Sequence, residues 1–186
     1  MDKKELRAKI KKIREGLLFE EKNRLSENIT NKFLELEEVK KAKVIMSYMD
    51  IKNEVQTKKL NENLKQMGKK VLLPSVEDLG IKVYEDNELY KKSKFGVLEP
   101  FGEEYRGNID IIIVPGIVFN SSGDRIGFGK GYYDKFLSKN IYKKSLKISI
   151  IYNFQLVNDF LGEEFDQKID MLVKENDILN FLNIEK

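Results

Sequence analysis

The sequence of 186 residues contains no cysteine and no histidine. The first absence excludes disulfides, thiolate nucleophiles and thiolate metal sites, and the second excludes imidazole bases and most zinc centres. Carboxylate, lysine, arginine, tyrosine, serine and backbone groups remain, and these suit phosphates and hard cations such as Mg²⁺. Phosphoryl transfer fits this inventory because it depends mainly on positioning and charge neutralisation.

The sequence also lacks a strong net charge and a long apolar run. Its 34 Lys and Arg residues and 31 Asp and Glu residues are mixed along the chain and leave a net charge of +3. We therefore expect no nucleic-acid partner. No apolar run approaches the ~20 residues of a membrane span, and the charged N-terminus lacks the apolar core of a signal peptide. We expect a cytoplasmic protein without a membrane partner.

Length and composition are typical of one globular domain. A chain of this size buries roughly 70% of its unfolded surface on folding. Hydrophobic residues make up 41% of the chain and charged residues 35%, and we find no internal repeat or low-complexity linker. The sequence therefore predicts a single domain over residues 1–186.

Apolar periodicity predicts the helices and strands. Helical spacing after a possible cap at Asp2 predicts a first helix (Leu6, Ile10, Ile13 and Leu17). A second helix is predicted over residues 19–36, with Leu25, Ile29, Phe33 and Leu36 facing inward, and a third from a cap at Thr57 to Met67. Apolar runs predict strands over residues 44–48, 71–73 (ended by Pro74), 81–84, 109–114 and 146–151.

Alternation of strands and helices predicts an α/β fold with a mostly parallel central sheet and helices on both faces. Ligands of such sheets bind beyond the carboxyl ends of the strands. The loops that follow residues 48, 114 and 151 are expected at that edge. Residues 85–107, which are rich in Lys and Glu, are expected to form an irregular excursion.

The most informative segment is a glycine-rich loop that follows a buried strand. In residues 125–134 (RIGFGKGYYD), glycines alternate with other residues, so that backbone N–H groups can approach an anion, while Arg125 and Lys130 supply positive charge. A helix predicted from Tyr132 would add its dipole. A turn that only reverses the chain would leave these cations unexplained. The spacing fits neither the Walker loop nor the dinucleotide fingerprint, so the residues indicate a nucleotide or another phosphate compound without identifying it.

Longer motifs surround this loop. Residues 115–137 read PGIVFNSSGDRIGFGKGYYDKFL, and shorter segments are KKELR (residues 3–7) with Arg14 beyond it, NEVQT (53–57), LLPSV (72–76), GVLEP (96–100) and EEFDQKID (163–170). Over nearly its whole length the sequence thereby resembles the 5-formyltetrahydrofolate cyclo-ligase family, whose members are also called 5,10-methenyltetrahydrofolate synthetases.

The resemblance implies an ATP- and Mg²⁺-dependent ligase that closes 5-formyltetrahydrofolate to 5,10-methenyltetrahydrofolate and releases ADP and phosphate. It implies a phosphorylated formyl group, an iminophosphate, as intermediate. No protein side chain need act as a covalent nucleophile, in agreement with the absence of cysteine and histidine. We expect a monomer that accepts the folate with or without a polyglutamate tail.

The resemblance also assigns site residues. Those expected to contact ATP are Lys3, Lys4, Arg7, Arg125, Ile126, Gly127, Phe128, Gly129, Lys130, Gly131, Tyr132 and Tyr133. Among these, Arg125, Lys130 and Tyr132 are expected to be catalytic. Those expected to contact the folate are Met49, Glu54, Phe95, Gly127, Phe128, Gly129, Lys130 and Gly131. Those expected to hold Mg²⁺ are Asp134 and Asp166.

Each assignment competes with an ordinary structural role. The N-terminal cations could form a charged outer face, and Lys130 could be a solvated surface lysine. Asp134 could pair with Lys130 along a helix, and Asp166 could be a turn residue. Glu54 could be an exposed glutamate before a helix. Tyr133 could pack in the core. Phe95 stands where the family often has tryptophan and could only fill space by packing. Phe165 stands where the family often has histidine.

Other functions remain open on the residues alone. A sugar-phosphate isomerase or a CoA-type acyl transferase could share this architecture, because a fold does not determine a function. A module that stores folate or senses a nucleotide without catalysis is a third possibility. The isomerase and the transferase would not require ATP, and the binding module would form no ADP.

Overall fold

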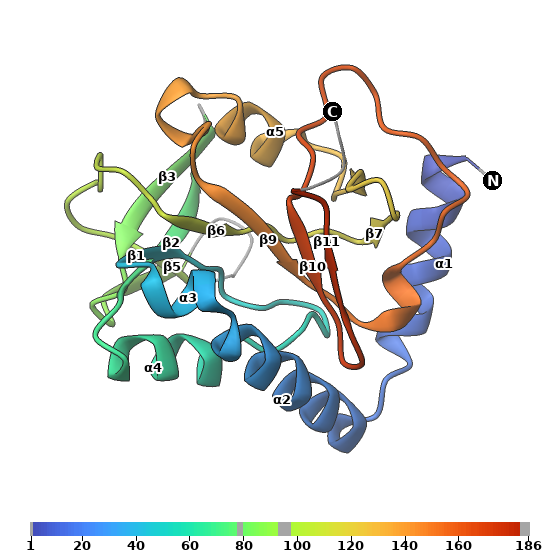
Figure 1. The fold of residues 1–186 in the computed structure, drawn as a ribbon, viewed down its shortest axis with the longest axis horizontal. Helices are drawn as coiled ribbons and strands as arrows, with labels where there is room; N and C mark the ends of the chain where they lie inside the picture. The colour runs from blue at the N-terminus through green and yellow to red at the C-terminus, as the bar shows by residue number, and fades with distance from the viewer. Residues whose placement is uncertain (1, 78–79, 93–97, 183–186) are drawn as a thin grey trace.

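The computed structural model describes residues 2–77, 80–92 and 98–182, and it is built on a seven-stranded sheet with the order β11-β10-β9-β6-β1-β2-β3 (Figure 1). The strands of this sheet are β1 (Val44–Met46), β2 (Lys70–Glu77), β3 (Gly80–Glu85), β6 (Ile111–Ile113), β9 (Leu146–Ile150), β10 (Met171–Val173) and β11 (Ile178–Asn180). The five inner strands run parallel, and β3 and β11 close the two edges antiparallel. The single-domain α/β fold with a mostly parallel sheet is therefore confirmed.

Three helices cover one face of the sheet: α2 (Phe19–Glu35), α3 (Glu37–Lys41) and α4 (Lys58–Gln66) (Figure 1). From α2, Leu25, Ile29 and Phe33 pack into the core as predicted, and Leu36 is partly buried against it. The opposite face is covered by α5 (Tyr132–Leu137) and the short 3₁₀ helix η1 (Asn140–Tyr142). Helices on both faces are thus confirmed. No helix in residues 2–77, 80–92 and 98–182 is long and apolar enough to span a membrane.

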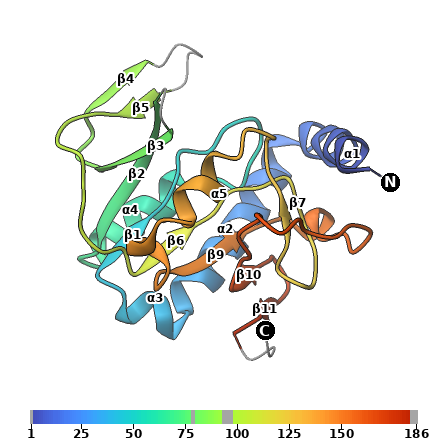
Figure 2. The ribbon, with the colours of Figure 1, turned by 90° about the horizontal axis from the view of Figure 1, so that it is seen from above.

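The first helix, α1 (Lys3–Glu15), lies at one end of the molecule (Figure 2). Asp2 caps it as predicted, because its carboxylate accepts the N–H groups of the first turn in a capping box. Leu6 and Ile10 are buried, but Ile13 is 41% exposed and the next residue, Arg14, is only 2% exposed. The buried stripe of this helix therefore ends on a cation instead of an apolar residue.

Helix α1 packs on a two-stranded hairpin formed by β7 (Val118–Phe119) and β8 (Arg125–Ile126). Asn120 closes the turn of this hairpin, because its side-chain oxygen accepts the N–H groups of Ser122 and Asp124. This Asx-type turn directs the chain from the β6 edge back toward α1. The glycine-rich loop begins directly after β8.

Three predictions about local structure are wrong. Pro74 does not end β2; the strand passes through it, because β1 pairs only with Lys70 to Leu72 and leaves Pro74 bonded on one side. Residues 85–107 are not wholly irregular, since β4 (Tyr90–Lys92) pairs with β5 (Leu98–Pro100). Thr57 precedes α4, but its hydroxyl donates to the carbonyl of Tyr48 instead of capping the helix.

Candidate active site

The predicted loops meet at one edge of the sheet. Strands β1, β6 and β9 are parallel neighbours, so their carboxyl ends lie side by side. The loop after β1 carries Met49 and Glu54, and the segment after β6 leads through the hairpin to the glycine loop. After β9, the hydroxyl of Tyr152 donates to the backbone carbonyl of Glu54 at 3.0 Å. The topology therefore brings together segments that are far apart in the sequence.

The glycine loop, residues 127–131, has a backbone that only glycine adopts readily. Gly129 has φ +91° and Gly131 has φ +65°, both in the left-handed region. The N–H groups of residues 128–131 have no hydrogen-bond acceptor within the described part of the chain. The loop therefore presents a row of amide donors, as the sequence predicted.

Two arginines flank this loop. Nε of Arg7 donates to the carbonyl of Gly127 at 2.9 Å, and a Cβ at position 129 would lie 3.8 Å from Cζ of Arg7. On the other side, a Cβ at Gly127 would lie 3.6 Å from Nη1 of Arg125. Two guanidinium groups thus lie against the backbone of residues 127–129, one from α1 and one from β8.

The remaining cations of the predicted ATP set are more exposed. Lys130 and Lys4 are exposed, and neither forms an ion pair or a side-chain hydrogen bond with any described residue. Ile126 is buried in the core beneath the loop, and Tyr132 packs partly against the core. The structure therefore offers Lys130 to solvent at the tip of the glycine loop.

The segments that carry the two predicted metal ligands lie side by side. Oδ1 of Asp134 accepts the backbone N–H of Gln167 at 3.1 Å, so Asp134 lies beside the residue that follows Asp166. Each carboxylate also pairs with a cation: Oδ1 of Asp134 with Arg125 at 2.7 Å, and Oδ2 of Asp166 with Lys3 at 3.2 Å. Asp134 does not pair with Lys130, its alternative partner along the helix.

These carboxylates fit a hard cation in their donor chemistry. The other oxygen of each has no hydrogen bond or ion pair to a residue of the described ranges, and both side chains are partly exposed. No group of three or more Asp, Glu, His or Cys residues in those ranges could hold a metal. Two carboxylates together with waters and phosphate oxygens suffice for Mg²⁺. Phe165 is 82% exposed beside Asp166.

Glu54 is not the exposed glutamate of the alternative interpretation, since it is only 5% exposed. Its Oε2 accepts the N–H of Ile51 at 3.0 Å, which closes a tight turn. Burial raises the pKa of this carboxyl from 4.5 to about 7, although the Ile51 N–H and the charge of Arg14 act in the opposite direction. The protein therefore contains a buried acid that titrates near neutral pH.

Two further groups lie near Glu54. Tyr133 packs against the core, as its alternative role predicted, and its hydroxyl is buried with no partner in the described structure. Burial and the charge of Glu54 raise the pKa of that hydroxyl. Nη1 of Arg14 lies 3.9 Å from Oε1 of Glu54. The sequence analysis gave Arg14 no role, although its place seven residues after Arg7 puts both arginines on one side of α1.

Met49 lines a hollow of about 460 Å³ between the loop after β1, helix α4 and the hairpin β4–β5. Leu73 and Tyr90 form apolar parts of its wall. Glu54, which lies in the same loop after β1, is not among the residues that line this hollow. Phe95, which was also predicted to contact the folate, lies outside the described residues.

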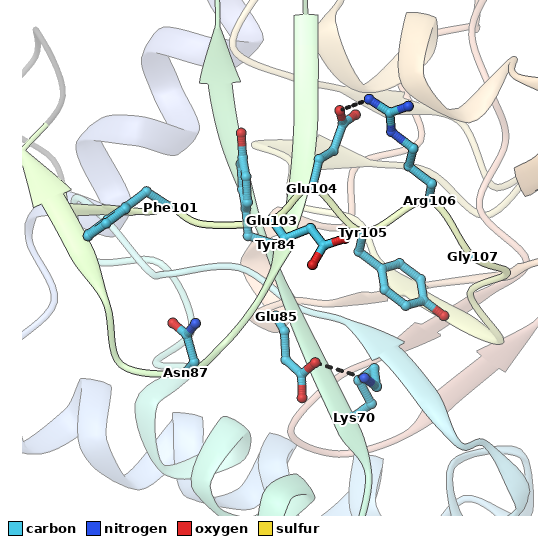
Figure 3. Close-up of a pocket in the computed structure, with 10 residues that line it drawn as sticks. All are labelled: Lys70, Tyr84, Glu85, Asn87, Phe101, Glu103, Glu104, Tyr105, Arg106 and Gly107. Carbon is cyan, nitrogen blue, oxygen red and sulfur yellow. Dashed lines mark hydrogen bonds and ion pairs between the residues drawn. The ribbon is translucent and has the colours of Figure 1, made fainter.

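A second hollow, of about 750 Å³, lies away from these loops (Figure 3). Lys70 and Glu85 form one wall and pair at 2.7 Å. Lys70 begins β2, and Glu85 ends the antiparallel β3, so this hollow lies at the amino edge of the parallel strands. It contains none of the predicted site residues.

Comparisons with known proteins agree with this architecture. The model of the 5-formyltetrahydrofolate cyclo-ligase family matches residues 1–175. The chain belongs to the 5-formyltetrahydrofolate cyclo-ligase family. A cyclo-ligase of Mycoplasma pneumoniae is 33% identical, with 94% of this chain and 99% of that protein covered. One of Haemophilus influenzae is 28% identical, with coverages of 92% and 97%.

Solved structures support the same family. The 5,10-methenyltetrahydrofolate synthetase of Aquifex aeolicus superposes with a TM-score of 0.87 at 35% identity, covering 100% of this chain and 96% of that one. The synthetase of Mycoplasma pneumoniae gives a TM-score of 0.78 at 30% identity, with coverages of 94% and 99%. The chain is therefore an enzyme of this cyclo-ligase family, a ligase of folate one-carbon metabolism.

Proposed function

We propose that this cyclo-ligase converts 5-formyltetrahydrofolate to 5,10-methenyltetrahydrofolate and consumes one ATP in each turnover, with Mg²⁺. The observation that carries the ATP requirement is the glycine loop. It combines amide N–H groups that have no acceptor in the described structure with the guanidinium group of Arg7 and with the exposed Lys130, while Arg125 is buried beside the loop and pairs with Asp134. Such a set of donors fits the oxygens of a triphosphate.

The need for ATP follows from the substrate. The formyl oxygen is a poor leaving group, so ring closure requires that it be activated first. Attack of this oxygen on the γ-phosphorus breaks the bond to ADP and forms an iminophosphate. Nitrogen 10 then attacks the formyl carbon and loses its proton, and phosphate leaves with the former formyl oxygen. The protein must hold the γ-phosphate in line with the formyl oxygen, which is a task of positioning.

The residues divide this task. The glycine loop, Lys130, Lys3, Lys4 and Arg7 would hold the triphosphate. Met49 and Glu54 would receive the pterin, because a carboxylate can accept paired hydrogen bonds from the ring N–H and the amino group. Asp134 and Asp166 would hold Mg²⁺, which supplies neutralisation of phosphate charge when it is bound.

The experiment follows the methenyl chromophore after 5-formyltetrahydrofolate is mixed with the protein, ATP and Mg²⁺. The chromophore should appear only when all components are present, with one ADP formed for each product. Conversion without ATP would contradict the proposal. Tight binding of both ligands without formation of ADP would favour the binding module.

Neutralising one metal ligand should raise the Mg²⁺ requirement. In Asp166→Asn, we expect the Mg²⁺ concentration for half-maximal rate to rise about tenfold or more, because one of two carboxylate ligands loses its charge. Asp159→Asn is the matched control, since Asp159 is exposed in the same segment. Identical Mg²⁺ titrations of the two variants at saturating ATP would remove Asp166 from the metal site.

Several expectations from the sequence stay predictions. These are the extent of the domain over residues 1–186, a monomeric state, a cytoplasmic location, the absence of a nucleic-acid partner and the acceptance of polyglutamylated substrate. Sedimentation of the purified protein tests whether it is a monomer. A single species of about 21.8 kDa is expected.

A further inference from the structure

Arg14 is the buried cation whose position the proposed mechanism does not yet use. It lies in the last turn of α1 and is 2% exposed. Its Nε and Nη1 have no hydrogen-bond partner in the described structure. Burial of a charged group without hydrogen bonds is unfavourable. The buried charge of Arg14 therefore suggests a role beyond the stability of the fold.

Arg14 lies near both predicted binding regions, the glycine loop and the loop that carries Glu54. Its guanidinium lies 3.9 Å from a carboxylate oxygen of Glu54 and 6.0 Å from the ring centroid of Phe128 in the glycine loop. Its backbone carbonyl accepts a hydrogen bond from the side chain of Asn53 at 3.3 Å. Arg14 thus lies between the glycine loop and the turn that carries Glu54.

That turn has an unusual backbone. Lys52 and Asn53 are consecutive non-glycine residues with positive φ, +48° and +58°. Such conformations cost energy unless neighbouring contacts hold them. The contacts here are the Ile51 N–H on the carboxylate of Glu54 and the Asn53 amide on the carbonyl of Arg14. The conformation of the turn and the direction of the Glu54 side chain are therefore fixed together.

We propose that Arg14 is a positioning residue for the folate: its guanidinium favours the ionised form of Glu54 and orients this carboxylate as the acceptor of the pterin N–H groups. This inference rests on the proposed function, because it assumes that Glu54 receives the pterin. A protonated Glu54 would lose one acceptor oxygen and could not accept both hydrogen bonds of the pterin edge. Arg14 acts through Glu54 and need not touch the substrate.

The charged and titratable groups around Glu54 determine in which direction the loss of Arg14 shifts the pKa of Glu54. They are Arg14 from α1, Asp50 from its own loop, Tyr48 after β1, Tyr133 from α5 and Tyr152 after β9. Arg14 is the cation among the groups that shift Glu54, and Asp50 opposes it. Removal of the guanidinium should therefore raise the pKa of Glu54 further, so that ionisation requires a higher pH.

The test measures binding of 5-formyltetrahydrofolate by calorimetry between about pH 6 and pH 9, where a carboxyl shifted by burial titrates. The wild type should bind more weakly below about pH 7, the pKa of Glu54. In Arg14→Gln this loss should move upward by about one pH unit, and binding at pH 7 should weaken about fivefold, because the ionised fraction of Glu54 falls from about one half to about one tenth. Affinity for a non-hydrolysable ATP analogue should stay within about twofold of the wild type.

Three variants make the result specific. Lys12→Gln removes an exposed charge from the same helix and should leave the binding curve unchanged. Arg14→Lys keeps the charge and should restore most of the wild-type curve, even if Arg14→Gln folds poorly. Glu54→Gln cannot ionise and should show no dependence in this range.

The outcomes separate the two proposals. Wild-type protein that does not bind 5-formyltetrahydrofolate overturns the proposed function and this inference with it. Wild-type turnover with an Arg14→Gln curve that matches the wild type overturns the inference alone. Equal weakening at every pH in both Arg14→Gln and Arg14→Lys shows a structural role only and also overturns it.

Discussion

Lys130→Ala should lower kcat/KM for ATP by about 10²- to 10³-fold, the loss expected when one donor to a transferring phosphoryl group is removed. Lys130 extends from the glycine loop into solvent, with no ion pair or hydrogen bond to the rest of the described chain. Its charge is therefore available to the triphosphate. Stability should change by no more than about 0.5 kcal/mol, as for other exposed positions.

Lys135→Ala is the control for this variant. Lys135 is exposed on α5, five residues further along, and its removal changes the net charge equally. Initial rates at limiting ATP, together with urea unfolding of both variants, give the comparison. Near-normal turnover of Lys130→Ala at limiting ATP would exclude the assigned role.

Stability should fall as pH rises from about 4.5 to about 7, because burial raises the pKa of Glu54 across this interval. The folded protein binds the Glu54 proton more tightly than the unfolded chain does, so each step upward in this window favours unfolding. The pKa difference is 7 − 4.5 = 2.5. It corresponds to a loss of about 3 kcal/mol in the free energy of unfolding, complete above pH 7.

Other carboxylates titrate in the same range, so the measurement compares wild type with Glu54→Gln. Urea unfolding at pH 5 and at pH 8 should show a decrease that is larger in the wild type by about 3 kcal/mol. In Glu54→Gln, the buried Arg14 lies beside a neutral amide at both pH values, so its contribution to the stability of the variant is the same at each. Parallel pH dependences of the two proteins would show that Glu54 is ionised as readily in the fold as in the unfolded chain.

Apolar patterns in the sequence predicted the long helices and the central strands of the sheet. Helices α1, α2 and α4 repeat apolar residues at helical spacing, β6 is a continuous apolar run, and β9 alternates apolar residues with Lys147 and Ser149. The short strands were missed. Strands β10 (Met171–Val173) and β11 (Ile178–Asn180) lie in short segments flanked by charged residues, and their pairing in the sheet is set by contacts between distant parts of the chain.

The sequence predicted which loops lie together at the candidate site, but it did not predict the ion pairs between its elements. The alternation of glycines and cations indicated the row of amide donors, because it is a local property of the chain. The pairing of Arg125 with Asp134 and that of Arg14 with Glu54 join different elements. Apolar spacing also predicted that Ile13 would be buried, whereas Arg14, the next residue of the helix, is buried instead. Only the packed structure shows that a buried stripe can end on a cation.

The transfer of the γ-phosphoryl group to the formyl oxygen can be followed with 5-formyltetrahydrofolate that carries ¹⁸O in its formyl group. After turnover with ATP and Mg²⁺, ³¹P NMR of the released phosphate reports where this oxygen went. We predict that each phosphate carries one ¹⁸O atom and that ADP carries none. Unlabelled phosphate formed together with the methenyl product would contradict activation of the formyl group by ATP.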